Sequence, residues 1–176
     1  MKKSTIGNFS QLCFLRKVRE CAIGDASQLY TLINWDASPI AQEVKMKIKT
    51  GTDIIEVDRI KESIEKFGNS FKNRVFTAQE IEYCEKKNIN KFQSYAGRFA
   101  AKEAVFKALS EYIDNKFEVQ WTDIEVINDE NGRPFINLYG EFEKKVGNNF
   151  DIDISISHVN QMAMASAVAY LKSVIY

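Results

Sequence analysis

Four charged residues in one stretch of the sequence have a spacing that could do chemistry. Glu103 and Lys107 lie four residues apart, on one stripe of a helix, and Arg98 and Lys102 form a second stripe. Apolar residues border both stripes, which is unusual for a helix with a single solvent face. The charges are therefore expected to face a site or an interface. An exposed Glu–Lys pair without further function is the alternative.

A carboxylate elsewhere in the chain favours the first interpretation. Asp53 stands in an isoleucine-rich run, residues 51–55, where the pattern predicts a strand. Burying a carboxylate there is costly unless a positive charge compensates it, and a metal ion would do so. Mg²⁺ typically binds one or two protein carboxylates and fills its other positions with water and substrate phosphate. Asp53 and Glu103 are therefore candidate Mg²⁺ ligands.

Two candidates lie nearer the C-terminus, and both have an ordinary alternative. His158 is the only histidine in the chain and follows a predicted strand, where a histidine is more often a turn residue than a catalyst. Arg133 belongs to Asn-Gly-Arg-Pro, residues 131–134, so its guanidinium could meet a phosphate. The same residues also make a good turn without any ligand.

The elements that must position these residues form an α+β pattern. We predict a strand over 47–57, followed by a helix that Asp58 caps and Gly68 ends. A second helix should begin at the Thr77–Glu80 capping box, and a third should span 94–112. Hairpins are predicted for 122–138 and 151–169. The expected fold is a mostly antiparallel sheet packed against one long helix.

Composition bounds the class of protein. The 24 basic and 24 acidic side chains balance, so binding of nucleic acid through bulk charge is not expected. No run approaches the roughly 20 apolar residues of a membrane span, and we expect a cytoplasmic protein. The three cysteines lack paired spacing, which favours reduced thiols.

The first 45 residues differ from the rest of the chain. They predict a short strand and a helical turn or two, too little for a core of their own, and Met46 begins a run that looks like a natural start. We expect a leader of uncertain status over 1–45 and the main domain over 46–176. A faint likeness of the leader to acetyltransferases is not supported, because their phosphate loop is absent from the sequence.

Five ordered motifs from Met46 onward resemble those of the holo-acyl-carrier-protein synthases, in the 4'-phosphopantetheinyl transferase superfamily. They are Gly51-Thr-Asp-Ile-Ile-Glu-Val-Asp-Arg-Ile60, Arg74-Val-Phe-Thr-Ala-Gln-Glu80, Ala96-Gly-Arg-Phe-Ala-Ala-Lys-Glu-Ala-Val-Phe-Lys-Ala-Leu109, Asn131-Gly-Arg-Pro134 and Ser155-Ile-Ser-His158.

The resemblance implies a fold, a reaction and partners. It implies the 4'-phosphopantetheinyl transferase fold and an enzyme that moves the 4'-phosphopantetheine arm of coenzyme A onto a serine of an acyl carrier protein, for fatty acid biosynthesis. Adenosine 3',5'-bisphosphate would leave, and the acceptor of the serine proton is left open. Mg²⁺ is the implied cofactor, and a homotrimer with sites between subunits is the implied assembly.

The resemblance also implies roles for single residues. Asp53 and Glu103 correspond to the two magnesium ligands, and Lys107 to a lysine beside the coenzyme A pyrophosphate. Arg59 corresponds to an arginine that engages the acidic carrier protein. For the coenzyme A nucleotide and its phosphates, the implied contacts are Arg98, Arg133, Ser157 and His158. Val159 replaces a residue that is often polar, which leaves one nucleotide contact in doubt.

A non-catalytic binding or assembly module on the same fold is the alternative from another functional class. Loss of either metal carboxylate would have favoured it. Asp53 and Glu103 are both present, so the enzyme is the preferred interpretation.

Overall fold

The computed structural model describes residues 47–115, 118–147 and 149–171. The predicted leader lies outside these residues, and the boundary near Met46 stays a prediction. Within the described ranges no helix is long and apolar enough to cross a bilayer.

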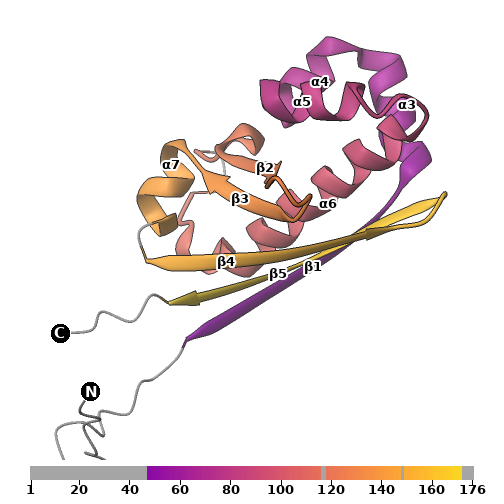
Figure 1. The fold of residues 1–176 in the computed structure, drawn as a ribbon. Helices are drawn as coiled ribbons and strands as arrows, with labels where there is room; N and C mark the ends of the chain where they lie inside the picture. Colours follow the sequence, from indigo (N-terminus) through magenta and orange to yellow (C-terminus); the bar gives the residue numbers. More distant parts are fainter. Residues whose placement is uncertain (1–46, 116–117, 148, 172–176) are drawn as a thin grey trace, which may run out of the picture. The chain divides into compact units, whose positions relative to one another are not determined.

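One sheet of three antiparallel strands carries the fold. The strands are β1 (Ile48–Glu56), β4 (Phe150–His158) and β5 (Met162–Leu171), in the order β1-β5-β4. The strands β2 (Ile124–Asn128) and β3 (Pro134–Leu138) form a separate antiparallel hairpin. The prediction of a mostly antiparallel α+β fold is therefore confirmed (Figure 1).

Four helices lie between β1 and the hairpin in the sequence. They are α3 (Val57–Phe67), α4 (Asn69–Val75), α5 (Ala78–Glu85) and α6 (Lys91–Leu109). Short helical segments complete the fold: the 3-10 helices Asn88–Asn90, Ser110–Tyr112 and Trp121–Asp123, the turn α7 (Gly140–Phe142), and a π-helical turn over Glu143–Gly147. Figure 1 shows α6 running along one side of the sheet.

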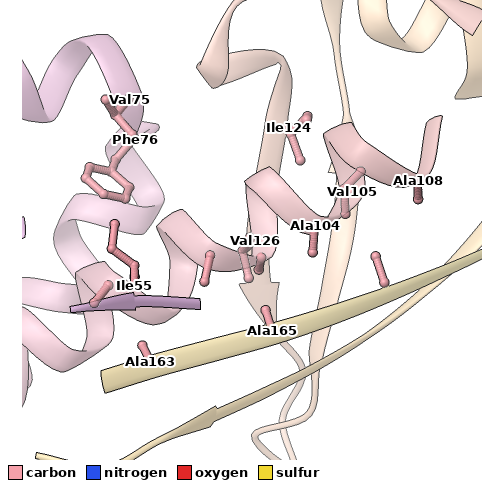
Figure 2. Packing of buried hydrophobic residues seen from close by; sticks show 14 of the residues in the cluster. Ile55, Val75, Phe76, Ala104, Val105, Ala108, Ile124, Val126, Ala163 and Ala165 are labelled. Carbon is pink, nitrogen blue, oxygen red and sulfur yellow. The ribbon is translucent and has the colours of Figure 1, made fainter. Parts of the chain in front are cut away.

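Small residues allow α6 to lie very close to the sheet. The inner face of β5 is an alanine row, and Figure 2 shows Ala165 of this row on the side of β5 that faces α6, with Ala163 farther along the strand, near Ile55. Opposite the helix on β1 stands Gly51, where a Cβ atom would collide with the backbone of Ala104 and Ala108. The strand and the helix are therefore in backbone contact at Gly51.

A buried ion pair joins α5 to α6. The Lys102 ammonium lies 2.6 Å from Glu80 Oε2, and both side chains are 0% exposed. Glu80 also makes the predicted capping box with Thr77, and its Oε1 accepts the Val126 N–H at 2.9 Å. Burial raises the pKa of Glu80 and lowers that of Lys102, while their mutual attraction opposes both shifts. The expectation that Lys102 faces a site is therefore wrong.

Three further predictions need correction. The cap of α3 is Glu56, which makes no side-chain cap bond, so Asp58 is not the cap. The long helix begins at Lys91 and ends at Leu109, followed by a 3-10 turn. The apolar residues that border the charged stripes include Phe99 and Phe106, and these two face their own chain, because each ring lies 5.9 Å from the Trp121 ring.

Lys102→Met is expected to lower the free energy of unfolding by about 3–5 kcal/mol, because it leaves the Glu80 carboxylate buried without its cation. The matched control is Lys86→Met, which breaks the exposed pair with Glu82 and should lower the free energy of unfolding far less. Urea unfolding of both variants measures the difference. Equal losses would contradict the structural role of the buried pair.

Candidate functional site

Asp53 and Lys107 meet where β1 passes α6. Strand alternation turns Asp53 to the inner face of the sheet with Gly51, and its side chain is 15% exposed. The Lys107 ammonium donates to Asp53 Oδ1 at 2.7 Å and to the Thr52 carbonyl at 3.2 Å. The backbone contact at Gly51 brings these two elements together.

Glu103 adds a second carboxylate to this place. It lies one helical turn before Lys107, is partly buried, and accepts no hydrogen bond from a described residue. Burial raises the pKa of Glu103, the negative charge of Asp53 raises it further, and Lys107 opposes both effects. The two carboxylates are therefore close enough to repel each other.

This donor set fits a hard divalent cation. One or two carboxylates are the protein ligands that Mg²⁺ commonly takes, with its other positions left to water and phosphate. The described ranges hold no group of three acidic, histidine or cysteine side chains that could form a protein-only metal cage. The structure thus places Asp53 and Glu103 near each other, and their role as ligands of a cation stays a prediction.

A pocket of about 220 Å³ lies on another side of α6. Its lining residues are Tyr83, Gln93, Ser94, Gly97, Arg98, Asn128, Gly132, Pro134, Ile156 and His158. Arg98 is 5% exposed and donates from Nη2 to Asn128 Oδ1 at 2.8 Å, while its buried Nε–H has no acceptor. The structure therefore brings Arg98 and His158 together around a pocket with an unused buried donor.

Tyr83 and Asn128 were not found from the sequence. The Tyr83 ring lies 3.9 Å from the Arg98 guanidinium carbon, and Asn128 also donates to the Gly132 carbonyl at 2.8 Å. Both residues hold Arg98 from other elements, so the spacing of residues near Arg98 in the sequence does not predict these contacts. The Asn-Gly turn after β2 was the available signal for Asn128.

Two predicted phosphate contacts lie outside the pocket lining. Ser157 is exposed on the outer face of β4, because it alternates with the inward-facing Ile156. Arg133 is exposed and forms an ion pair with Asp153 at 3.0 Å. Their roles stay predictions.

Arg59 lies on α3, six residues after Asp53 in the sequence. Its side chain is exposed and makes no ion pair with a described residue. The guanidinium is therefore available to an acidic partner.

Comparisons with known proteins find relatives over most of the chain. A family model described as the 4'-phosphopantetheinyl transferase superfamily matches residues 49–163. The holo-[acyl-carrier-protein] synthase of Ruminiclostridium cellulolyticum is 46% identical over 129 residues, which are 72% of this chain and 94% of that protein. The synthase of Clostridium tetani is 47% identical over 125 residues, 70% of this chain and 95% of its own.

Solved structures with the same fold include complexes with coenzyme A. A holo-(acyl-carrier-protein) synthase from Bacillus anthracis, in complex with coenzyme A (3',5'-ADP), is 34% identical with a TM-score of 0.59, covering 72% of this chain and 99% of that one. An ACPS–CoA complex from Chronobacterium ammoniagenes is 27% identical with a TM-score of 0.64, again covering 72% and 99%. The matched range 49–163 contains every candidate residue.

The acidic pair predicts how Mg²⁺ affects stability. Mg²⁺ should raise the melting temperature of the wild type, and Glu103→Gln should weaken the apparent Mg²⁺ affinity at least about tenfold. Without the ion at pH 7, Glu103→Gln should be no less stable than the wild type, because a carboxylate with a raised pKa is penalised once it ionises. Thermal unfolding against Mg²⁺ concentration measures this. Identical curves would contradict the metal site.

Proposed function

The chain belongs to the 4'-phosphopantetheinyl transferase superfamily, and we propose that it carries out its reaction with Mg²⁺ held by Asp53 and Glu103. The activity is that of a holo-acyl-carrier-protein synthase: the 4'-phosphopantetheine group of coenzyme A is transferred to a serine of apo acyl carrier protein. The observation that carries the metal assignment is the pair of neighbouring carboxylates, of which Glu103 accepts no hydrogen bond from a described residue.

The transfer is a displacement at phosphorus. The serine hydroxyl gives up its proton to a base and its oxygen forms a bond to the β-phosphorus of coenzyme A. The bond from that phosphorus to the bridging oxygen breaks, and adenosine 3',5'-bisphosphate leaves. When bound, Mg²⁺ neutralises negative charge on the pyrophosphate and the leaving phosphate.

Lys107 supplies the protein's own positive charge at this place. An ammonium group has three N–H donors, and Lys107 uses donors toward Asp53 and the Thr52 carbonyl. Its side chain is 49% exposed, so a remaining donor can reach a pyrophosphate oxygen. Lys107 thus orients Asp53 and binds the substrate at once.

The pocket of Arg98 and His158 would take the other phosphate of coenzyme A. The molecule carries a pyrophosphate and a 3'-phosphate on the ribose, and the first belongs beside Lys107. The unpartnered Nε–H of Arg98 supports this assignment, because a buried guanidinium donor without an acceptor is costly unless a ligand supplies one.

The positions of the two groups support sites that are shared between copies, as in the homotrimer that the family resemblance implies. Arg98 and Lys107 are nine residues apart on α6, which turns them about 180° from each other. A helix with its side chains is about 10–12 Å thick, more than the ribose that separates the two phosphates of coenzyme A. One coenzyme A would therefore meet the Lys107 side of one copy and the Arg98 side of another.

The outer face of the sheet supports assembly as well. It exposes a set of large apolar side chains, a surface typical of an interface. The exposed members on β1 and β5 are Ile48, Ile54, Met164, Val168 and Tyr170. We assign this face to contacts between copies.

We also place the reaction in fatty acid biosynthesis in the cytoplasm, in line with the sequence-based expectation.

Mass spectrometry of an apo acyl carrier protein tests the proposed function. After incubation with the protein, coenzyme A and Mg²⁺, the carrier protein should gain the mass of one phosphopantetheine. The gain should disappear with a chelator and fall by about a hundredfold or more in rate with Glu103→Gln. A wild-type protein that leaves the carrier protein unmodified would overturn the function. Full activity without any divalent cation would overturn the assignment of Mg²⁺ to this site.

Arg59→Ala should raise the KM for the carrier protein on the order of tenfold and leave the KM for coenzyme A unchanged, because an exposed unpaired cation on α3 attracts an acidic protein partner. Lys66→Ala on the same helix is the matched control, since Lys66 stacks on Phe67. Steady-state kinetics with each substrate varied in turn measures both constants. Equal changes in the two constants would remove Arg59 from the carrier-protein surface.

A further inference from the structure

A cleft separates the end of β3 from the beginning of β4. The two strands run beside each other in Figure 1, but they belong to different sheets. A cavity of about 500 Å³ opens between them, and its walls come from residues 136–139, from Glu143 and Gly147, and from residues 150–152. None of these residues lines the Arg98 pocket or belongs to the acidic pair. This β3–β4 cleft is therefore separate from both groups of the proposed reaction.

The edge of β3 toward this cleft has no strand paired with it. Tyr139, the residue after β3, donates its N–H to the Asp123 carbonyl at 2.8 Å, on the side of β2. Main-chain groups along an antiparallel strand point alternately to one side and the other. The N–H and C=O groups of Ile136 and Leu138 therefore point away from β2, on the side of the cleft.

The edge of β4 is unpaired in the same place. Val159, the residue after β4, donates its N–H to the Met162 carbonyl at 2.9 Å, on the side of β5. By the same alternation, Phe150 and Ile152 turn their main-chain groups away from β5. Among the described residues no main-chain hydrogen bond crosses from these two to β3. Donors and acceptors on both sides of the cleft are thus left to water or to a ligand.

The side chains of the cleft add negative charge. The charged residues in its wall are Glu143 and Asp151, and both are acidic. Glu143 is exposed and has no basic partner among the described residues, whereas Glu141 is paired with Lys144 at 2.5 Å. Glu143 begins the π-helical turn that also places Gly147 in the wall. The cleft therefore favours a ligand with a basic group.

We propose that the β3–β4 cleft binds an extended segment of a partner protein that carries a basic side chain. The segment lies as an added strand, so that its main-chain groups pair with the open strand edges while its basic side chain meets Glu143. The wall over 136–139 has room for about four residues, because a strand rises about 3.3 Å per residue. This goes beyond the proposed function, since Arg59 is the contact proposed for the acidic carrier protein and a basic segment indicates a different partner.

Titration of the full chain with a short synthetic peptide, acetyl-Thr-Lys-Val-Lys-Thr-amide, tests the cleft. In NMR spectra the amide signals of Ile136, Leu138, Phe150 and Ile152 should shift together as the peptide is added. A fully N-methylated version keeps both charges but cannot donate main-chain hydrogen bonds, so it should bind at least about tenfold more weakly. The counterpart with glutamate in place of both lysines should also bind more weakly.

Two variants that remove the same charge separate Glu143 from the acidic residues around it. Glu143→Gln should weaken binding of the lysine peptide by about two- to fivefold. Glu141→Gln is the matched control and should bind the peptide as the wild type does, because Glu141 is already paired with Lys144.

Three results would each contradict the added strand. One is a wild type in which the lysine peptide leaves the four cleft amides unshifted. Another is an N-methylated peptide that binds as tightly as its parent, since main-chain pairing then contributes nothing. The third is equal weakening by the two variants, because attraction to Glu143 would then be only attraction to an acidic surface.

Discussion

The buried ion pair between Lys102 and Glu80 fixes the rotation of α6 about its axis. One ammonium group binds the Glu80 carboxylate, the Val75 carbonyl at 2.8 Å and the Trp121 carbonyl at 3.1 Å, so three segments close around one point of the helix. Glu103 is the next residue, about 100° around the helix. With Lys102 held inside, Glu103 must turn toward β1. Arg98 lies four residues before Lys102, on nearly the same side of the helix, and must turn toward α5. Both halves of the site therefore depend on this pair.

Much of this architecture could be predicted because it depends on the spacing of residues that are close in sequence. The Thr77–Glu80 capping box, the Asn-Gly turn of the β2–β3 hairpin and the alternating strands β4 and β5 all depend on residues close in sequence. The pairing of Asp53 with Glu103 needed the family resemblance as well. Nothing local connects two residues fifty positions apart, although the cost of burying Asp53 pointed to a missing cation.

Other features could not be read from the sequence because their partners come from different elements. A lysine in an alanine-rich helix looks like a solvent or ligand charge until the buried Glu80 is seen beside it. Tyr83 holds Arg98 from a separate helix in the same way. The apolar residues that border the charged stripes pointed to a site or an interface. Two of them, Phe99 and Phe106, are instead covered within the chain by Trp121, which comes from a segment with little regular pattern.

The contact at Gly51 has a consequence for how the site tolerates change. Most distances in a protein core are set by side chains, which can rearrange when a neighbour is replaced. At Gly51, main chain meets main chain, and main-chain atoms have no rotamers to adjust. The distance between the strand that carries Asp53 and the helix that carries Glu103 is thus fixed by the main chain. Conservative replacements in the rest of the core can change how firmly the molecule holds together while the two carboxylates keep their spacing.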